Sequence, residues 1–270
     1  MRGRNPARPT PPEPDREWRR IEIGGAGIAY RVVGAGPPVV LVHGLAGSGR
    51  WWERNVGPLS ARFQVFVVDL PGFGGNRVGA PFALVETPAL LAAWLDRLGL
   101  GRVAVVGHSM GGRVAAELAA DAPERVARLV LVAAAIFPAG PDWPVRAWGL
   151  AGALRRVSPA FVPILAWDAA RAGPRTLLRA GHALLTTGVE AKLPQIAAPT
   201  LVVWGEGDTI VPPAVGERLT ALVPGARLVV LAGGDHTPMW SRADAFNALV
   251  LEFLADAGAG DEGWANTESD

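Results

Sequence analysis

Apolar residues along the chain gather in short, uninterrupted runs that lack polar alternation. Such runs are typical of strands buried on both faces of a parallel sheet, because neither face meets water. The clearest runs lie at residues 38–44, 63–72, 102–109, 127–135, 200–208 and 226–236. They predict the strands of a mostly parallel sheet.

The stretches between these runs have helical character and complete an alternation of strands and helices. They lie near residues 50–60, 84–98, 111–121, 213–223 and 240–255. Upstream, two strand-like runs at 18–23 and 28–33 are joined across a glycine-rich turn and predict a hairpin. This order predicts an α/β fold with a mostly parallel, doubly wound sheet of about eight strands and helices on both sides.

One interval, residues 136–196, breaks the alternation because it contains no convincing buried strand. A structureless loop of that length is improbable in a compact domain, so we expect an inserted helical cap over the carboxyl edge of the sheet. Trp143, Trp148 and Trp167 of this interval are candidates for lining a substrate pocket, although tryptophan more often anchors one layer to another. The predicted division of the chain is a disordered Pro-rich tail (1–16), the first part of the core (17–135), the cap (136–196), the second part of the core (197–256) and a flexible C-terminal tail (257–270).

The sequence Gly107-His108-Ser109-Met110-Gly111 stands directly after a predicted strand and directly before a predicted helix. A sharp turn from strand to helix holds the central serine in a strained conformation and projects its hydroxyl above the sheet edge. The glycines let neighbouring backbone pass without a Cβ clash. The following helix points its N-terminus at the site, which favours developing negative charge. We therefore identify Ser109 as the candidate nucleophile; the alternative is a plain glycine-rich turn.

A serine hydroxyl is a weak nucleophile unless a base accepts its proton, and a carboxylate must orient that base. His236 follows the last predicted strand, where a loop at the carboxyl end of the sheet can meet Ser109. Asp208 follows the preceding strand and is the favoured carboxylate, with Glu206 as its rival. Asp235 adjoins His236 and is expected to brace the loop.

The order serine, aspartate, histidine, each after a different strand, resembles the α/β-hydrolase superfamily and its branch of serine esterases and C–C hydrolases. The resemblance covers residues 17–256 and depends on HGLAGS (43–48), DLPGFG (69–74), GHSMGG (107–112), WGEGD (204–208) and GGDHTP (233–238). It implies an oxyanion hole formed by the backbone N–H groups of Leu45 and Met110. It also implies that His43 braces the first of these loops and that Asp69 shapes a neighbouring loop.

A serine nucleophile favours acyl-enzyme chemistry and disfavours the alkyl-enzyme chemistry of relatives with aspartate at this position. The leading hypothesis is a carboxylesterase acting on a small-molecule ester or related acyl substrate. Three alternatives stay open: a C–C hydrolase of ring-fission diketones, a cofactor-free perhydrolase or haloperoxidase-like enzyme, and a ligand receptor with the same fold. Relatives that cleave diketones often carry asparagine where this chain has His108, and they bind a substrate carboxylate by arginine. The basic residues of the cap outnumber the acidic ones, which we interpret as solvated helix faces.

Composition excludes several classes of function. A net charge of +1 gives no electrostatic basis for binding nucleic acid, and the absence of cysteine excludes disulfides, thiolate metal sites and a cysteine nucleophile. Histidines and carboxylates are too scattered to suggest a metal site, and the serine mechanism needs no cofactor. The run Leu129–Phe137 is too short to span a bilayer and no signal peptide is evident, so we expect a cytoplasmic location. The sequence does not fix the oligomeric state, and a homodimer stays open.

Overall fold

The predicted strands form one sheet in a computed structural model that describes residues 17–76, 82–138 and 157–256. The strands are β1 (Arg19–Ile23), β2 (Ala26–Val33), β3 (Pro38–Val42), β4 (Gln64–Asp69), β5 (Val103–His108), β6 (Val126–Val132), β7 (Thr200–Gly205) and β8 (Arg227–Leu231).

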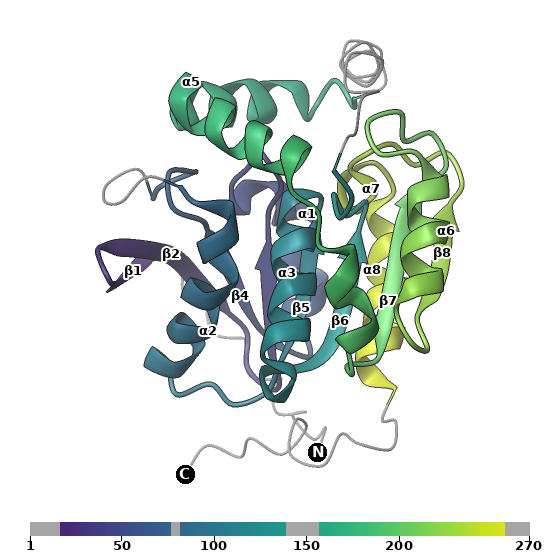
Figure 1. The fold of residues 1–270 in the computed structure, drawn as a ribbon, viewed down its shortest axis with the longest axis horizontal. Coiled ribbons are helices and arrows are strands. Elements are labelled where there is room, and N and C mark those ends of the chain that lie inside the picture. The colour runs from purple at the N-terminus through teal and green to yellow at the C-terminus, as the bar shows by residue number, and fades with distance from the viewer. Residues whose placement is uncertain (1–16, 77–81, 139–156, 257–270) are drawn as a thin grey trace, which may run out of the picture.

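The eight strands lie in the order β1-β2-β4-β3-β5-β6-β7-β8. Strand β2 is antiparallel to both of its neighbours, as expected for a hairpin at the start of the sheet, and the remaining neighbours pair in parallel. Each residue of β3, β5, β6 and β7 is buried, which explains why their sequences lack polar alternation. The prediction of a mostly parallel sheet in an α/β fold is confirmed (Figure 1).

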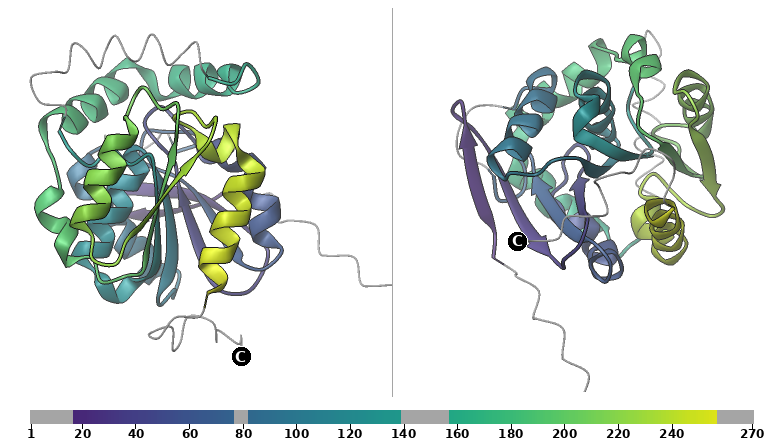
Figure 2. Two further views of the ribbon diagram at one scale, coloured as in Figure 1. Left: turned by 90° about the vertical axis from the view of Figure 1, so that its right-hand side faces the viewer. Right: turned by 90° about the horizontal axis from the view of Figure 1, so that it is seen from below.

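Helices cover both faces of the sheet (Figures 1 and 2). They are α1 (Glu53–Ser60), α2 (Thr87–Arg97), α3 (Met110–Asp121), α5 (Val162–Thr186), α6 (Pro213–Leu222), α7 (Pro238–Ser241) and α8 (Ala243–Ala255), with 3-10 turns η1 (Gly49–Trp52), η2 (Leu84–Glu86), η3 (Pro123–Arg125) and η5 (Glu190–Gln195). Helices α2, α3 and α6 contribute Leu91, Val114 and Leu219 to one apolar cluster, whereas α1 and α8 contribute Val56 and Phe246 to the other. Within the described ranges, no helix combines the length and the apolar character needed to cross a membrane.

Two sequence-based expectations are corrected by the structure. The run at 226–236 was expected to be buried on both faces, but β8 is only half-buried because it is the last strand of the sheet. The single helix expected at 240–255 is divided into α7 and α8 at Arg242, whose φ of −129° and ψ of 42° are not helical.

The described part of the interval 136–196 contains α5 and η5, and α5 lies across the carboxyl end of the sheet (Figures 1 and 2). Helix α5 is bent at Gly173, which has φ 75° and ψ 160° and precedes Pro174. Proline supplies no N–H and clashes with the preceding turn, so the helix consists of two arms, 162–172 and 174–186. The second arm passes over the loop after β4, where Thr176 lies against Gly72.

Candidate active site

The turn between β5 and α3 holds Ser109 in a backbone conformation that residues other than glycine rarely adopt, with φ 52° and ψ −113°. Such a conformation costs about 1–3 kcal/mol and persists only where its surroundings impose it. The Ser109 N–H donates to the Val132 carbonyl at 2.8 Å, and the Ser109 carbonyl accepts from the N–H groups of Arg113 and Ala135, both at 3.1 Å. These bonds fix the serine at the carboxyl edge of the sheet.

The His236 imidazole lies between a hydroxyl and a carboxylate. Its Nε2 is 3.2 Å from Ser109 Oγ, and its Nδ1 is 2.7 Å from Asp208 Oδ2. A carboxylate oxygen can only accept, so Nδ1 carries the proton and Nε2 is free to take one from the serine hydroxyl. The loops after β5, β7 and β8 thus bring the three predicted residues together.

Asp208 is held in place by its own turn. Its second oxygen, Oδ1, accepts from the N–H groups of Ile210 and Val211, both at 2.9 Å, and the residue is buried. The rival carboxylate, Glu206, is exposed, and its Oε2 accepts from the Gly233 N–H at 3.0 Å. The geometry therefore favours Asp208 over Glu206 as the partner of His236.

The loop that carries His236 is braced on two sides. Asp235 Oδ1 accepts from the N–H and the hydroxyl of Thr237, at 2.7 and 2.9 Å, and from the Ser241 hydroxyl at 2.9 Å. On the other side, His108 Nε2 lies 2.8 Å from the carbonyl oxygen of His236. Asp235 therefore braces the loop as its position suggested, whereas nothing in the sequence pointed to the contact of His108.

A second loop, after β3, borders the serine. His43 is buried; its Nδ1 donates to the Gly44 carbonyl at 2.7 Å, and its Nε2 accepts from the Leu70 N–H at 3.1 Å. Burial lowers the pKa of His43 to about 4, which keeps the ring neutral and both bonds intact at neutral pH. A trans peptide places its C=O and N–H on opposite sides, so this bond turns the Leu45 N–H away from His43. A Cβ on Gly44 would lie 3.2 Å from Ser109 Cβ, so the same peptide borders the serine.

Met110 occupies the first position of α3, directly after Ser109. The first N–H groups of a helix have no acceptor within the helix, and they carry the positive end of its dipole. Leu45 and Met110 therefore present two backbone donors on the borders of Ser109. Together with the imidazole, such an arrangement can accept a proton and stabilise a negatively charged oxygen.

Asp69, at the end of β4, binds backbone from two loops. Its Oδ1 accepts from the Gly49 N–H at 2.6 Å and its Oδ2 from the Gly75 N–H at 2.7 Å. Burial raises the pKa of Asp69 to about 6, and the two backbone donors oppose that shift. The residue joins the loop after β3 to the loop after β4, as expected for a residue that shapes a loop.

An aromatic layer lies between α5 and the loops that carry Ser109, Asp208 and His236, which together are called the triad below. The Trp51 ring contacts the His108 ring at a centroid distance of 5.6 Å and the Phe161 ring at 5.1 Å. Phe161, which precedes α5, also contacts the Trp240 ring at 4.9 Å. These three large aromatic side chains are almost fully buried and give the site an apolar border.

A buried carboxylate joins α5 to this layer. Asp168 is 1% exposed, and its Oδ2 accepts from the Ser48 hydroxyl at 2.7 Å and from Trp51 Nε1 at 3.1 Å. Burial raises the pKa of Asp168, and the bond from Ser48 opposes that shift. The expectation that the charged residues of this interval lie on solvated helix faces does not hold for Asp168. A signal did exist, because Ile164, Asp168 and Ala172 are spaced by four residues and share the buried side of the helix.

Of the three tryptophans predicted to line a pocket, the structure describes only Trp167. Trp143 and Trp148 lie outside the described residues. Trp167 is 57% exposed on α5, and its ring is 5.8 Å from the Arg171 guanidinium carbon. Trp51, Phe161 and Trp240 border the site instead.

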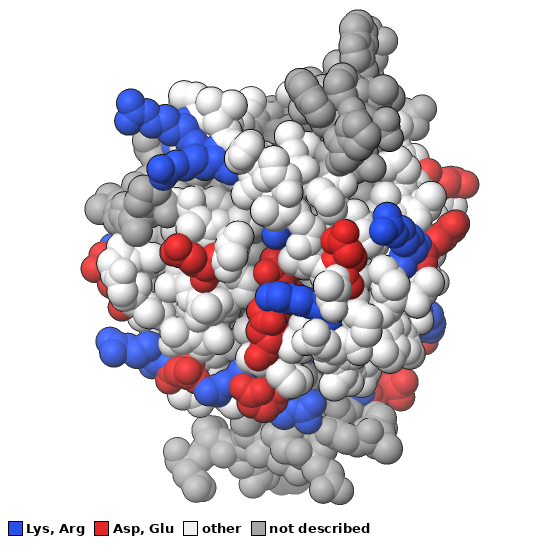
Figure 3. Space-filling model, in the orientation of Figure 1, with Lys and Arg blue, Asp and Glu red and all other residues white. Residues whose placement is uncertain are grey.

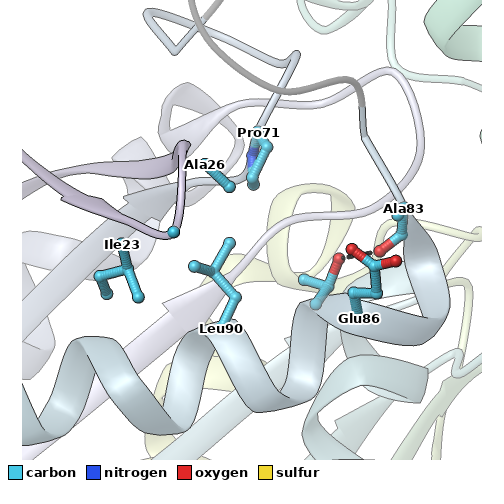
Figure 4. A pocket seen from close by; sticks show the side chains of 8 residues that line it. Ile23, Ala26, Pro71, Ala83, Glu86 and Leu90 are labelled. Carbon is cyan, nitrogen blue, oxygen red and sulfur yellow. Dashed lines mark hydrogen bonds between the residues drawn. The ribbon is translucent and has the colours of Figure 1, made fainter.

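A surface pocket of about 170 Å³ lies apart from the triad, between the β1–β2 turn and the start of α2 (Figure 4). It is lined by Ile23, Gly24, Ala26, Pro71, Ala83, Glu86, Thr87 and Leu90. Its volume is below the roughly 300–1,000 Å³ of ordinary small-molecule sites. The triad, rather than this pocket, is therefore the candidate for chemistry.

Comparison with known proteins gives a consistent family. The model of the alpha/beta hydrolase family matches residues 39–249. The chain is 35% identical over 251 residues to a pimeloyl-[acyl-carrier protein] methyl ester esterase from Nitrosomonas europaea, covering 82% of this chain and 97% of that protein. It is 31% identical over 260 residues to a 2-hydroxy-6-oxo-6-phenylhexa-2,4-dienoate hydrolase from Comamonas testosteroni, covering 84% and 91% of the two chains. The solved structure of a thermophilic esterase from Thermogutta terrifontis matches with a TM-score of 0.77 and 26% identity, covering 87% of this chain and 98% of that one.

The esterase from Nitrosomonas europaea and the hydrolase from Comamonas testosteroni are both named for hydrolysis. The match spans most of the sheet, from β3 to α8. On this evidence the chain belongs to the alpha/beta hydrolase family.

Proposed function

We propose that the chain is a serine hydrolase that cleaves a carboxylic ester through an acyl-enzyme intermediate. The observation that supports this most directly is the position of the His236 ring, 2.7 Å from Asp208 Oδ2 and 3.2 Å from Ser109 Oγ. A hydroxyl, an imidazole and a carboxylate in this series are the parts that activate a serine.

In the first half of the proposed reaction, His236 Nε2 takes the Ser109 hydroxyl proton while Oγ attacks the ester carbonyl carbon. The carbonyl oxygen becomes negative and accepts hydrogen bonds from the Leu45 and Met110 N–H groups. The imidazolium, stabilised by Asp208, then gives its proton to the departing alkoxide. The alcohol leaves, and the acyl group stays on Ser109 as an ester.

In the second half, a water molecule takes the place of the alcohol. His236 accepts one proton of this water while the water oxygen attacks the carbonyl carbon of the acyl-enzyme. The resulting tetrahedral intermediate uses the same two backbone donors. Its collapse returns the proton to Ser109 Oγ, releases the carboxylic acid and restores the starting enzyme. This chemistry requires only the named groups and water.

The surroundings of the triad support an ester with an apolar acyl or alcohol group. Trp51, Phe161 and Trp240 form the apolar border. Of the α5 arginines, Arg175 and Arg179 are exposed, and Arg171 contacts Trp167 and the Gly74 carbonyl. These positions agree with solvated helix faces rather than with a cluster that binds a substrate carboxylate. C–C hydrolysis is the second candidate function, because the chain is also similar to the hydrolase from Comamonas testosteroni.

The nucleophile is tested with p-nitrophenyl butyrate and a fluorophosphonate probe. Ser109→Ala and His236→Ala should each lower kcat by about 10⁴-fold or more, because members of a triad act as a unit. Neither substitution should change the midpoint of thermal unfolding. Labelling by the probe should be lost in Ser109→Ala. Near-normal turnover in that variant would end the proposal.

The carboxylate is tested by a matched pair. Asp208→Asn should lower kcat by about 10²-fold or more, because the imidazole loses its orientation and the stabilisation of its charged form. Glu206→Gln, two residues away on the same loop, should stay within about twofold of the wild type. The reverse ranking would move the carboxylate role to Glu206.

The substrate is tested with a panel of esters of graded acyl length beside a ring-fission diketone, each run to many turnovers. We expect repeated turnover of esters and a kcat/KM for the best ester above that for the diketone. Faster diketone cleavage would favour the C–C hydrolase. A single turnover followed by arrest would favour a ligand receptor.

A further inference from the structure

His108, the residue before the candidate nucleophile, makes one strong polar contact and leaves a second polar atom unsatisfied. Its ring is fully buried against Trp51 and the ring of His236, with centroids at 5.6 and 5.0 Å. Its Nε2 lies 2.8 Å from the main-chain carbonyl oxygen of His236. Its Nδ1 is buried and has no hydrogen-bond partner among the described residues.

The contact fixes the protonation state of the ring. A carbonyl oxygen can only accept, so Nε2 must carry a proton and donate it. Burial lowers the pKa of His108 well below its ordinary value, so the ring is neutral and Nδ1 keeps a bare lone pair. A Cβ on Gly44 would lie 2.7 Å from Nδ1, so this nitrogen lies beside the Gly44 backbone.

A buried polar atom without a partner lowers stability, because folding removes it from water and returns nothing. A histidine at position 108 is therefore a poor choice for packing alone, and an apolar side chain of similar length would avoid the unsatisfied Nδ1. The benefit of the histidine must lie in its other nitrogen, which binds the main chain of the residue that carries the imidazole.

We propose that His108 is a positioning residue whose Nε2–H holds the His236 backbone so that the His236 ring stays within reach of Ser109. The inference rests on the proposed serine hydrolase function. Ser109 approaches the ring of His236 while its neighbour His108 holds the main chain of the same residue. The nucleophile and the base are thereby joined at two points, and His236 is fixed at its carbonyl, at Nδ1 by Asp208 and at the loop by Asp235.

The test compares two substitutions of equal length. In His108→Gln the side-chain amide is as many bonds from Cα as Nε2 of histidine, so it can donate to the same carbonyl. In His108→Met the chain has the same length and no donor. We expect kcat for p-nitrophenyl butyrate to fall by about tenfold to a hundredfold in the Met variant with KM within about twofold, and the Gln variant to recover most of the loss. The thermal midpoint of the Met variant should stay close to that of the wild type, because losing the unsatisfied Nδ1 offsets losing the donor to the His236 carbonyl.

The outcomes separate the two hypotheses. Equal kcat and equal fluorophosphonate labelling rates for the wild type and the Met variant would overturn the role of His108 and leave the serine hydrolase intact. Parallel losses of kcat and thermal midpoint in both variants, with no recovery by Gln, would reduce His108 to a packing residue. A wild-type chain that the fluorophosphonate does not label at Ser109 would overturn the proposed function and this inference with it.

Discussion

Near Ser109, segments of main chain approach each other so closely that some positions have no room for a side chain. In α3, a Cβ on Gly111 would lie 2.4 Å from the Val42 carbonyl oxygen and 2.5 Å from that of His43. The helix therefore touches the end of β3 without any intervening side chain. This contact places the first turn of α3 beside the end of β3, from which the loop that carries Leu45 begins.

Substitution of Gly111 by alanine should destabilise the protein. The general gain in helix propensity, about 0.5–1 kcal/mol, is smaller than the cost of forcing a methyl group into a closed contact, about 1–3 kcal/mol or more. Gly57 of α1 is the matched control, since a Cβ there meets nothing within 4 Å. Urea unfolding should show a loss for Gly111→Ala and a gain for Gly57→Ala; two gains would contradict the proposed contact.

Sequence reasoning at this scale depends on whether a residue acts through its local setting or through a distant partner. Ser109 was predictable from a strand–turn–helix motif, and Asp208 and His236 from their positions after neighbouring strands. The partners of His108 and Asp168 were not, because each bond joins residues more than a hundred positions apart. A local pattern predicts that such a side chain is buried, but it does not show which group it meets.

Among elements, the first arm of α5 depends on a polar contact in an otherwise apolar junction. Phe161 supplies aromatic contacts, and Asp168 supplies the acceptor for Ser48 and Trp51. Gly173 ends the arm with a conformation that allows the next arm to change direction. The contact of Asp168 therefore determines how closely residues 162–172 approach the loop after β3.

Replacement of Asp168 by leucine should loosen this arm. The Ser48 hydroxyl and the Trp51 Nε1–H would both lose their acceptor, which lowers the free energy of unfolding by about 1–3 kcal/mol for each donor. Removing a buried carboxylate offsets only part of this loss. Hydrogen exchange should accelerate in residues 162–172 and stay unchanged in α3. Asp168→Asn keeps an acceptor oxygen and should show a smaller effect; equal exchange in all three proteins would contradict the role of this bond.

The extent of each element was predictable only where burial was uniform. Strands β3, β5, β6 and β7 are buried along their length, and their apolar runs predicted them closely. Strand β8 is half-buried because it ends the sheet, and strand order is not encoded in one run of residues. The bend of α5 at Gly173-Pro174 has a visible sequence signal, whereas the direction of its two arms depends on tertiary contacts.

Over the whole molecule, basic and acidic residues nearly balance, with a net charge of +1. Figure 3 shows basic and acidic side chains interspersed on one face, with a basic group over α5. Two buried side chains have strongly shifted pKa values. Burial lowers the pKa of His43 to about 4 and raises the pKa of Asp69 to about 6. Unfolded histidine binds a proton below about pH 6.5, so His43 makes stability rise with pH from about 4 to 6.5. In the folded protein, the Asp69 carboxyl group loses its proton at a higher pH than it does in the unfolded chain. Its contribution to stability therefore falls as the pH rises from about 4 to about 6.

Removing one of these opposing groups should therefore change the slope of stability against pH. In Asp69→Asn the opposing contribution is lost, and the free energy of unfolding should rise more steeply with pH between about 4 and 6, by up to about 1.4 kcal/mol per pH unit. Urea titrations at several pH values measure the slope independently of any overall loss of stability. Parallel lines for the variant and the wild type would contradict a raised pKa for Asp69.

The chain leaves the sheet after β6 and returns in β7, and these two strands are direct neighbours, with Leu129 beside Thr200 and Val132 beside Val203. Whatever the intervening chain does, its two ends must meet again at the same place. A segment of another length could thus be grafted there without shifting the strand register, and substrate choice could diverge while the reacting groups stay fixed. A graft must, however, bring its own acceptor for Ser48 and Trp51, or those two donors would remain buried with nothing to bind.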